Sequence, residues 1–341
     1  MFKSILLPLA LIVVGLALWL FPEGPQPTKP EPKPEPVATP GVPEIVFPPV
    51  DKPAPIVAVD PDYSQWSEEE EEIRQRLLAI LRQPLDVSDP HKYKKQRFAQ
   101  RNALLDLLDT LGESEVELLV ALLLQEEDSL MRRYLLMAIG RIGSPLAVDA
   151  LTDHYWRIFR SNQETELNYT IKALGLAKSP ASFDRLSEMI QTDLAAEHRF
   201  RFIQELGEHP DSRRAIPLFL ESADRRNDDY FKNRSRAALA LKIANDPRSA
   251  PKVEQLLDHE DNEYVRQALC GTLGALGDPA SVTRLKSIAE GENEQFQTRM
   301  SAVRALTKIG TEEARAVVEG VANNDGDERV RKEAARRLQD F

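Results

Sequence analysis

The side chains that most often bind metals or transfer protons are scattered along this chain. The five histidines occur without a His-Glu-x-x-His pattern and without a cysteine at metal-binding spacing: His91, His154, His198, His209 and His259. The acid-rich segment 323–328 has the composition of a calcium loop, but alignment on its glycine places Val321 and Lys332 where oxygen ligands are required. These patterns predict no catalytic residue, no metal site and no cofactor.

The single cysteine and the net charge narrow the classes of function further. Cys270 is the only cysteine, so an intramolecular disulfide is excluded, and its place on the apolar side of a predicted helix indicates a small core residue. The formal net charge is −11. Because nucleic-acid binding requires a basic face, we expect no nucleic-acid partner.

An aromatic and basic cluster is the first candidate for partner binding. It contains Tyr155, Trp156, Arg157 and Arg160, in a predicted helix whose apolar stripe includes Leu151 and Tyr155. At about 100° per residue, Trp156 lies roughly 140° around the helix from Leu151, which predicts an exposed ring. An exposed tryptophan beside arginines is typical of a protein-binding hot spot, and packing of Trp156 on an adjacent repeat is the alternative.

A long connection over residues 222–231 is the second candidate. It includes Arg225, Arg226 and Tyr230 and accounts for the widest repeat interval in the chain. Extra residues in the loops of repeat proteins often lie on a binding face, and simple variation in loop length is the alternative.

These candidates lie within a recurring pattern of an apolar helix, a small residue, a polar turn and a second helix. The small residues that end the first helix of each unit are Gly112, Gly143, Ala177, Gly207, Ala244, Gly277 and Gly310. They are about 30 to 37 residues apart, which is the spacing of stacked two-helix repeats. Such a unit cannot bury its apolar face alone, so the pattern predicts an all-α array without a sheet.

The sharpest copies resemble short HEAT repeats of the type found in phycobilin-lyase-like bacterial proteins. One copy contains Val265, Arg266 and Ala268, followed by the sequence Leu-Gly-Asp-Pro at 276–279. The next copy has Arg299 at the position that corresponds to Arg266. The resemblance implies a right-handed α-solenoid of about seven to eight helix pairs over residues 62–341. It also implies that the recurring arginine ties neighbouring repeats together through an acidic or carbonyl partner.

The N-terminal residues 1–21 have the pattern of a membrane anchor. Lys3 precedes an apolar run of about 17 residues, which is near the lower limit for a spanning helix. The bulky residues at 18–21 lack the small residues of a cleavage site, so an uncleaved single-pass transmembrane helix is favoured over a cleaved signal of a secreted protein. Lys3 favours a cytoplasmic N-terminus, which would place the solenoid outside the cytoplasm.

Residues 22–61 form a proline-rich segment that separates the anchor from the repeats. Its run 28–36 alternates proline with lysine and glutamate, and it resembles the periplasmic spacer of TonB-type proteins. A segment of this composition predicts an extended, disordered linker without a core.

Together these features favour a membrane-anchored adaptor in the periplasm of a Gram-negative bacterium, held at the inner membrane and binding another protein. A lyase-like or cell-envelope-modifying enzyme that uses the solenoid groove is one alternative. A structural protein that self-associates is the other.

Overall fold

The computed structural model describes residues 67–159, 161, 163–192 and 196–341. All described residues belong to one compact unit. The predicted anchor 1–21 and spacer 22–61 therefore lie outside the described residues. Among the residues that are described, no helix is both long and apolar enough to cross a membrane.

The described part of the chain is helical and contains no strand. The first helices of the repeats are α3 (Pro90–Leu108), α5 (Ser129–Ile142), α7 (Glu164–Leu176), α9 (Ala196–Gly207), α11 (Phe231–Ala244), α13 (Glu263–Leu276) and α15 (Phe296–Ile309). The second helices are α4 (Val116–Gln125), α6 (Pro145–Phe159), α8 (Pro180–Gln191), α10 (Ile216–Ser222), α12 (Ala250–His259), α14 (Val282–Ala289) and α16 (Glu312–Asn324). Helix α2 (Glu68–Leu81) precedes these seven pairs, and α17 (Glu328–Arg337) with the short 3-10 helix η6 (Leu338–Asp340) follows them.

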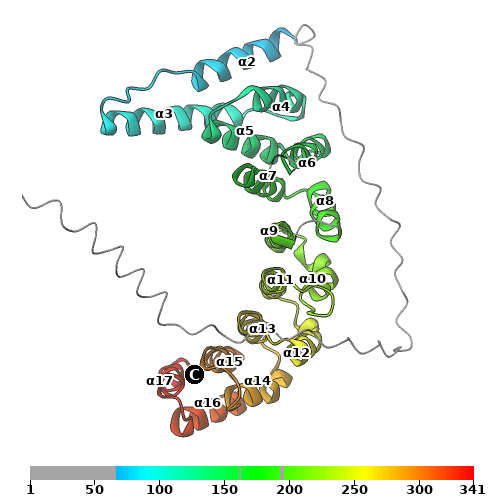
Figure 1. Ribbon diagram of the computed structural model, residues 1–341, viewed down its shortest axis with the longest axis vertical. Coiled ribbons are helices and arrows are strands. Elements are labelled where there is room, and N and C mark those ends of the chain that lie inside the picture. Colours follow the sequence, from blue (N-terminus) through cyan, green and yellow to red (C-terminus); the bar gives the residue numbers. More distant parts are fainter. Residues whose placement is uncertain (1–66, 160, 162, 193–195) are drawn as a thin grey trace, which may run out of the picture. The chain divides into compact units, whose positions relative to one another are not determined.

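The first helices form one layer and the second helices form another (Figure 1). From α5 to α17, each first helix packs on the next first helix, and each second helix from α4 to α16 packs on the first-layer helix that follows it in the chain. The interior between the layers is one continuous apolar core, which includes the fully buried Phe202 and Phe219. The predicted α-solenoid of stacked helix pairs is therefore confirmed.

Local capping explains where the helices begin and end. Helix α13 begins where the Asn262 side chain accepts hydrogen bonds from the backbone N–H groups of Tyr264 and Val265. It ends at Gly277, whose φ of 68° is a left-handed conformation that glycine adopts without steric cost. Gly310 ends α15 in the same way. Of the small residues that mark the sequence repeat, Gly143, Gly277 and Gly310 thus act as left-handed helix caps, whereas Gly207 and Ala244 are the last residues of their helices.

Close helix–helix contact explains the small residues inside the first helices. A Cβ atom on Gly274 of α13 would lie 2.6 Å from Cα of Ala305 of α15. Since real Cβ atoms do not approach another carbon so closely, only glycine allows these two helices their observed separation. By contrast, a Cβ on Gly271 of the same helix would meet no atom within 4 Å.

Candidate binding site

A ladder of arginines lies along the stack, at the fourth residue of six first-layer helices. Its members are Arg132, Arg199, Arg234, Arg266, Arg299 and Arg331. Two first helices are exceptions: α3 has Tyr93 at this position, and α7 has Leu167. There His154 of α6 lies 2.7 Å from Glu166, the carboxylate that also pairs with Arg132.

Arg266 illustrates the contacts that these arginines make. Its Nη1 donates to the carbonyl oxygens of Leu257 and Glu260, at 3.0 and 2.9 Å, and so satisfies the end of the preceding second helix. Its Nε donates to Glu294 at 3.2 Å, just before the next first helix. Arg234 does the same within the core, with Nε 2.7 Å from Glu260. The predicted tying role of the arginine is confirmed, and these charges are satisfied inside the stack.

The aromatic candidate lies at the end of α6 and is more buried than predicted. Tyr155 is fully buried and packs edge-to-face on Phe202, so its place among surface candidates is corrected. Trp156 is half-buried, because its ring turns back onto Tyr155 and Phe159, with centroid separations of 5.2 and 5.8 Å. Arg157 is exposed. The remaining member, at position 160, lies outside the described residues.

The second candidate, the connection between α10 and α11, is stabilised by one ion pair within the connection and one to the turn before α13. Arg226 donates to Asp224 and Arg225 pairs with Asp261 at 2.6 Å. Tyr230 is half-buried directly before α11, with its ring 5.9 Å from that of Phe231. The connection thus packs against the stack. It is separated from the α6 candidate by α7, α8 and α9, so the two predicted groups do not form one site (Figure 1).

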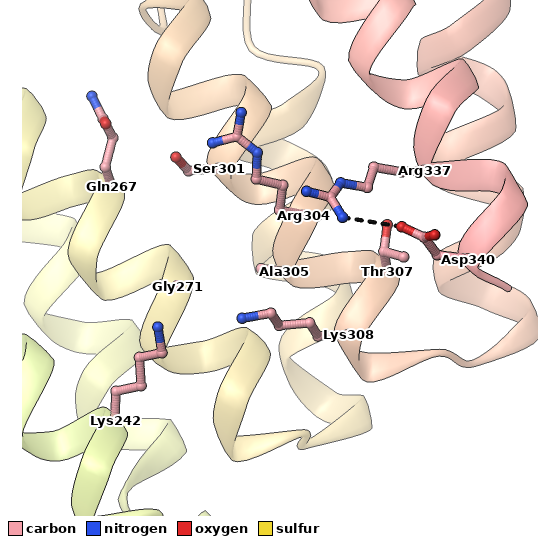
Figure 2. Close-up of a pocket in the computed structure, with 10 residues that line it drawn as sticks. All are labelled: Lys242, Gln267, Gly271, Ser301, Arg304, Ala305, Thr307, Lys308, Arg337 and Asp340. Atoms are coloured by element: carbon pink, nitrogen blue, oxygen red, sulfur yellow. Dashed lines mark hydrogen bonds and ion pairs between the residues drawn. The ribbon is translucent and has the colours of Figure 1, made fainter.

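A pocket that the sequence analysis missed opens on the first-helix layer. It has a volume of roughly 460 Å³ and is lined by residues of α11, α13, α15, α17 and η6 (Figure 2). We call it the basic pocket, because four of its ten lining residues are cationic and one is acidic: Lys242, Arg304, Lys308, Arg337 and Asp340.

The cations of the basic pocket differ in their partners. Arg304 and Arg337 both donate to Glu333, at 2.6 and 3.1 Å, and Arg337 also donates to Asp340 at 3.0 Å. Within the described part of the chain, Lys242 and Lys308 form no ion pair. The pKa of Lys308 lies below its ordinary value because partial burial disfavours the charged form and because the cations of Lys242 and Arg337 are near. The pocket therefore holds positive charge that the described residues do not neutralise.

The sequence contains a weak signal for this pocket. Gly271 interrupts a predicted helix in its middle, where glycine is disfavoured, and the neighbouring first helices end in Lys242 and Lys308. The two lysines are two repeats apart, so only the stack brings them together. No group of three or more histidine, cysteine or acidic side chains that could hold a metal is found among the described residues.

The stacked helix pairs define an α-solenoid, a class of repeat protein. The model of HEAT repeats matches residues 183–270, 225–296 and 250–339, so this part of the chain is built of HEAT repeats. Comparison with curated proteins finds no sequence match.

Two solved structures are similar to the chain. Human deoxyhypusine hydroxylase in complex with glycerol is 18% identical, over 80% of this chain and 96% of that chain, with a TM-score of 0.34. The complex of CpcE and CpcF of phycocyanin lyase from Nostoc sp. PCC7120 is also 18% identical, over 82% of this chain and 98% of that chain, with a TM-score of 0.32.

Proposed function

We propose that this chain is a scaffold that binds another protein through the first-helix layer of its HEAT-repeat stack. The observation that carries the proposal is the basic pocket, where Lys242 and Lys308 lie without an ion pair in the described region. Ladder arginines such as Arg266, in contrast, donate to carbonyl oxygens and a carboxylate inside the stack. Stacked repeats provide an extended surface of fixed shape, which is suited to recognition of a protein partner.

The proposal includes a membrane tether. The apolar residues 5–21 favour a single-pass anchor, and the proline-rich residues 22–61 favour a spacer between the bilayer and the repeats. In this arrangement the scaffold lies on the periplasmic side of the inner membrane and presents its pocket at a distance from the lipid surface.

Site-specific photocrosslinking in intact membranes tests the proposal. A photoreactive phenylalanine derivative is placed at Gly271 in the basic pocket, at Arg157 in the α6 candidate, or at Gly320 of α16 as a matched control. Gly271 and Gly320 are both helical glycines at which an added Cβ meets no atom within 4 Å, so the substitution is sterically similar at both.

We expect a discrete adduct with a second protein at Gly271 and none at Gly320. An adduct at Arg157 instead would move the binding face to the α6 candidate. Adducts with the mass of two copies of this chain would favour self-association, and equal diffuse adducts at all three positions would contradict a defined binding face.

A further inference from the structure

The basic pocket lies between the C-terminal halves of three helices. Lys242 is in the last turn of α11 and Lys308 is in the last turn of α15, on either side of α13. Figure 2 shows Lys308 extending toward Lys242 past α13 at Gly271. Because an added Cβ at Gly271 would meet nothing within 4 Å, the backbone of α13 is open to a ligand at this point.

Neutral hydrogen-bonding groups complete the lining. Gln267 of α13 and Ser301 and Thr307 of α15 line the same pocket as the lysines. The Gln267 amide donates to Glu263 and keeps a second N–H donor and its carbonyl acceptor. The two hydroxyl groups donate to carbonyl oxygens of their own helix and can accept from a ligand. A ligand that carries both negative charge and peptide groups would find partners for each.

We propose that the basic pocket binds an acidic segment of the partner protein, with carboxylates of that segment paired to Lys242 and Lys308. The inference rests on the scaffold function proposed above and names the chemistry of the bound partner. The volume of roughly 460 Å³ is sufficient for a few side chains and the backbone between them. Pairing with carboxylates would neutralise the two lysines that the described chain leaves without partners.

Other anionic ligands fit the pocket less well. Protein sites for phosphate commonly use the backbone N–H groups at a helix N-terminus, and Lys242 and Lys308 lie in last turns, away from such groups. The flat surface of a bilayer does not enter a recess between helices. Nucleic acid requires a basic face, and the chain has a formal net charge of −11.

Binding of a hexaglutamate peptide with a rhodamine label tests this chemistry directly. The full-length chain in a neutral detergent is titrated into the peptide, and fluorescence anisotropy reports binding. We expect saturable binding that weakens as the salt concentration rises, and no binding of a hexaglutamine peptide with the same label.

Two pairs of variants locate the site. Lys242→Glu/Lys308→Glu reverses both pocket lysines, and Lys252→Glu/Lys286→Glu makes the same change in net charge at exposed positions of α12 and α14. Lys242→Gln/Lys308→Gln removes the two pocket charges without reversing them, and Lys252→Gln/Lys286→Gln is its counterpart on α12 and α14. We expect at least a tenfold loss of peptide affinity in both pocket variants and less than a twofold change in both controls, with helical circular dichroism retained in all four.

Three results would overturn the assignment. The first is an equal loss of affinity in the pocket variants and their controls, which would mean that overall charge attracts the peptide. The second is displacement of the peptide by inorganic phosphate at an equal concentration of charge, which would make the pocket an oxyanion site. The third is stronger binding to vesicles with 30% phosphatidylglycerol, lost in the same variants, which would make it a lipid site.

The scaffold function and the recognition of carboxylates can be contradicted independently of each other. If the peptide binds in the pocket but no partner protein crosslinks at Gly271, the acidic-ligand chemistry stands and the scaffold function falls. If a partner crosslinks at Gly271 with undiminished yield in Lys242→Glu/Lys308→Glu, the scaffold stands and carboxylate recognition is overturned.

Discussion

Glu205 is the residue whose charge fits its surroundings least well. It lies on α9 against α7, where a Cβ added to Gly175 would be 2.8 Å from Cβ of Glu205. Burial at this contact raises the pKa of Glu205 to about 7, and the nearby carboxylate of Glu208 adds to the effect. The cations of Lys178 and Lys172 oppose it without cancelling it. The folded chain therefore holds this proton more tightly than an unfolded chain, in which the carboxyl group has its ordinary pKa of 4.5.

This difference predicts how stability changes with pH. Below about pH 4.5 the carboxyl group is protonated in both states, and as pH rises toward 7 the unfolded state loses its proton first, which destabilises the fold. Above pH 7 the folded state carries the full cost of the buried charge. We expect Glu205→Gln to be more stable than the native chain at pH 8 by about 1–2 kcal/mol, a figure reduced for partial solvent contact, and close to it at pH 4.5.

Urea unfolding at pH 4.5 and pH 8, followed by circular dichroism, measures the effect. Glu313→Gln, at an exposed position of α16, is the control and should leave the pH dependence unchanged. The same pH dependence in Glu205→Gln and in the native chain would show that the Glu205 carboxyl group is not the source.

At the scale of elements, α13 contains two glycines with opposite roles. Gly274 faces α15 at a separation that leaves no room for a side chain, whereas Gly271 faces the open pocket. We expect Gly274→Ala to destabilise the chain by about 1–3 kcal/mol because the added Cβ forces the two helices apart. Gly271→Ala should stabilise it by about 0.5–1 kcal/mol because alanine favours the helix.

Thermal or urea unfolding of the two variants provides the comparison. They share one helix and one change of residue type, so a difference in sign isolates the effect of packing. Destabilisation by both variants would mean that the helix at Gly271 is less open than the structure shows.

The elements themselves could be predicted because their causes are local. The caps at Asn262, Gly277 and Gly310, and the spacing of apolar residues between them, are properties of neighbouring positions. The tying role of Arg266 followed from the resemblance to HEAT repeats, and its partners Leu257 and Glu294 lie in adjacent units.

The sites were less predictable because they depend on rotamers and on the geometry of the stack. A helical wheel places Cβ atoms and not rings, so it did not show that Trp156 turns back onto Phe159. The basic pocket joins Lys242 to Lys308 across an intervening helix, and no property of either residue's neighbours in the chain indicates that meeting.

At the scale of the whole molecule, charge is distributed unevenly. The chain is acidic overall, and much of its arginine is engaged with carboxylates, either between repeats, as in Arg266 with Glu294, or along a helix. The basic pocket is thus a local concentration of positive charge on an acidic protein. An acidic partner would be repelled at long range and attracted only at close range, so recognition would depend on accurate docking and on confinement near the partner.

We propose that residues 22–61 keep the basic pocket within reach of its partner. Residues 22–61, if extended as their proline content predicts, would span on the order of 100 Å, whereas a Gly/Ser segment of equal length would have a root-mean-square span of only ~35 Å. Replacing 22–61 by Gly/Ser while keeping residues 1–21 should therefore lower the yield of the Gly271 crosslink in membranes several-fold. Deleting 22–61 should lower it further.

Peptide binding by the same two variants in detergent distinguishes an effect of spacer length from an effect on the affinity of the pocket. Because the pocket is built from α11, α13, α15 and the C-terminal helices, its affinity for hexaglutamate should be unchanged in both spacer variants. An undiminished crosslink after deletion would show that the partner is met close to the bilayer, and the spacer would then have no part in recognition. A loss confined to membranes would instead mean that partner access is set by the distance between the anchor and the pocket.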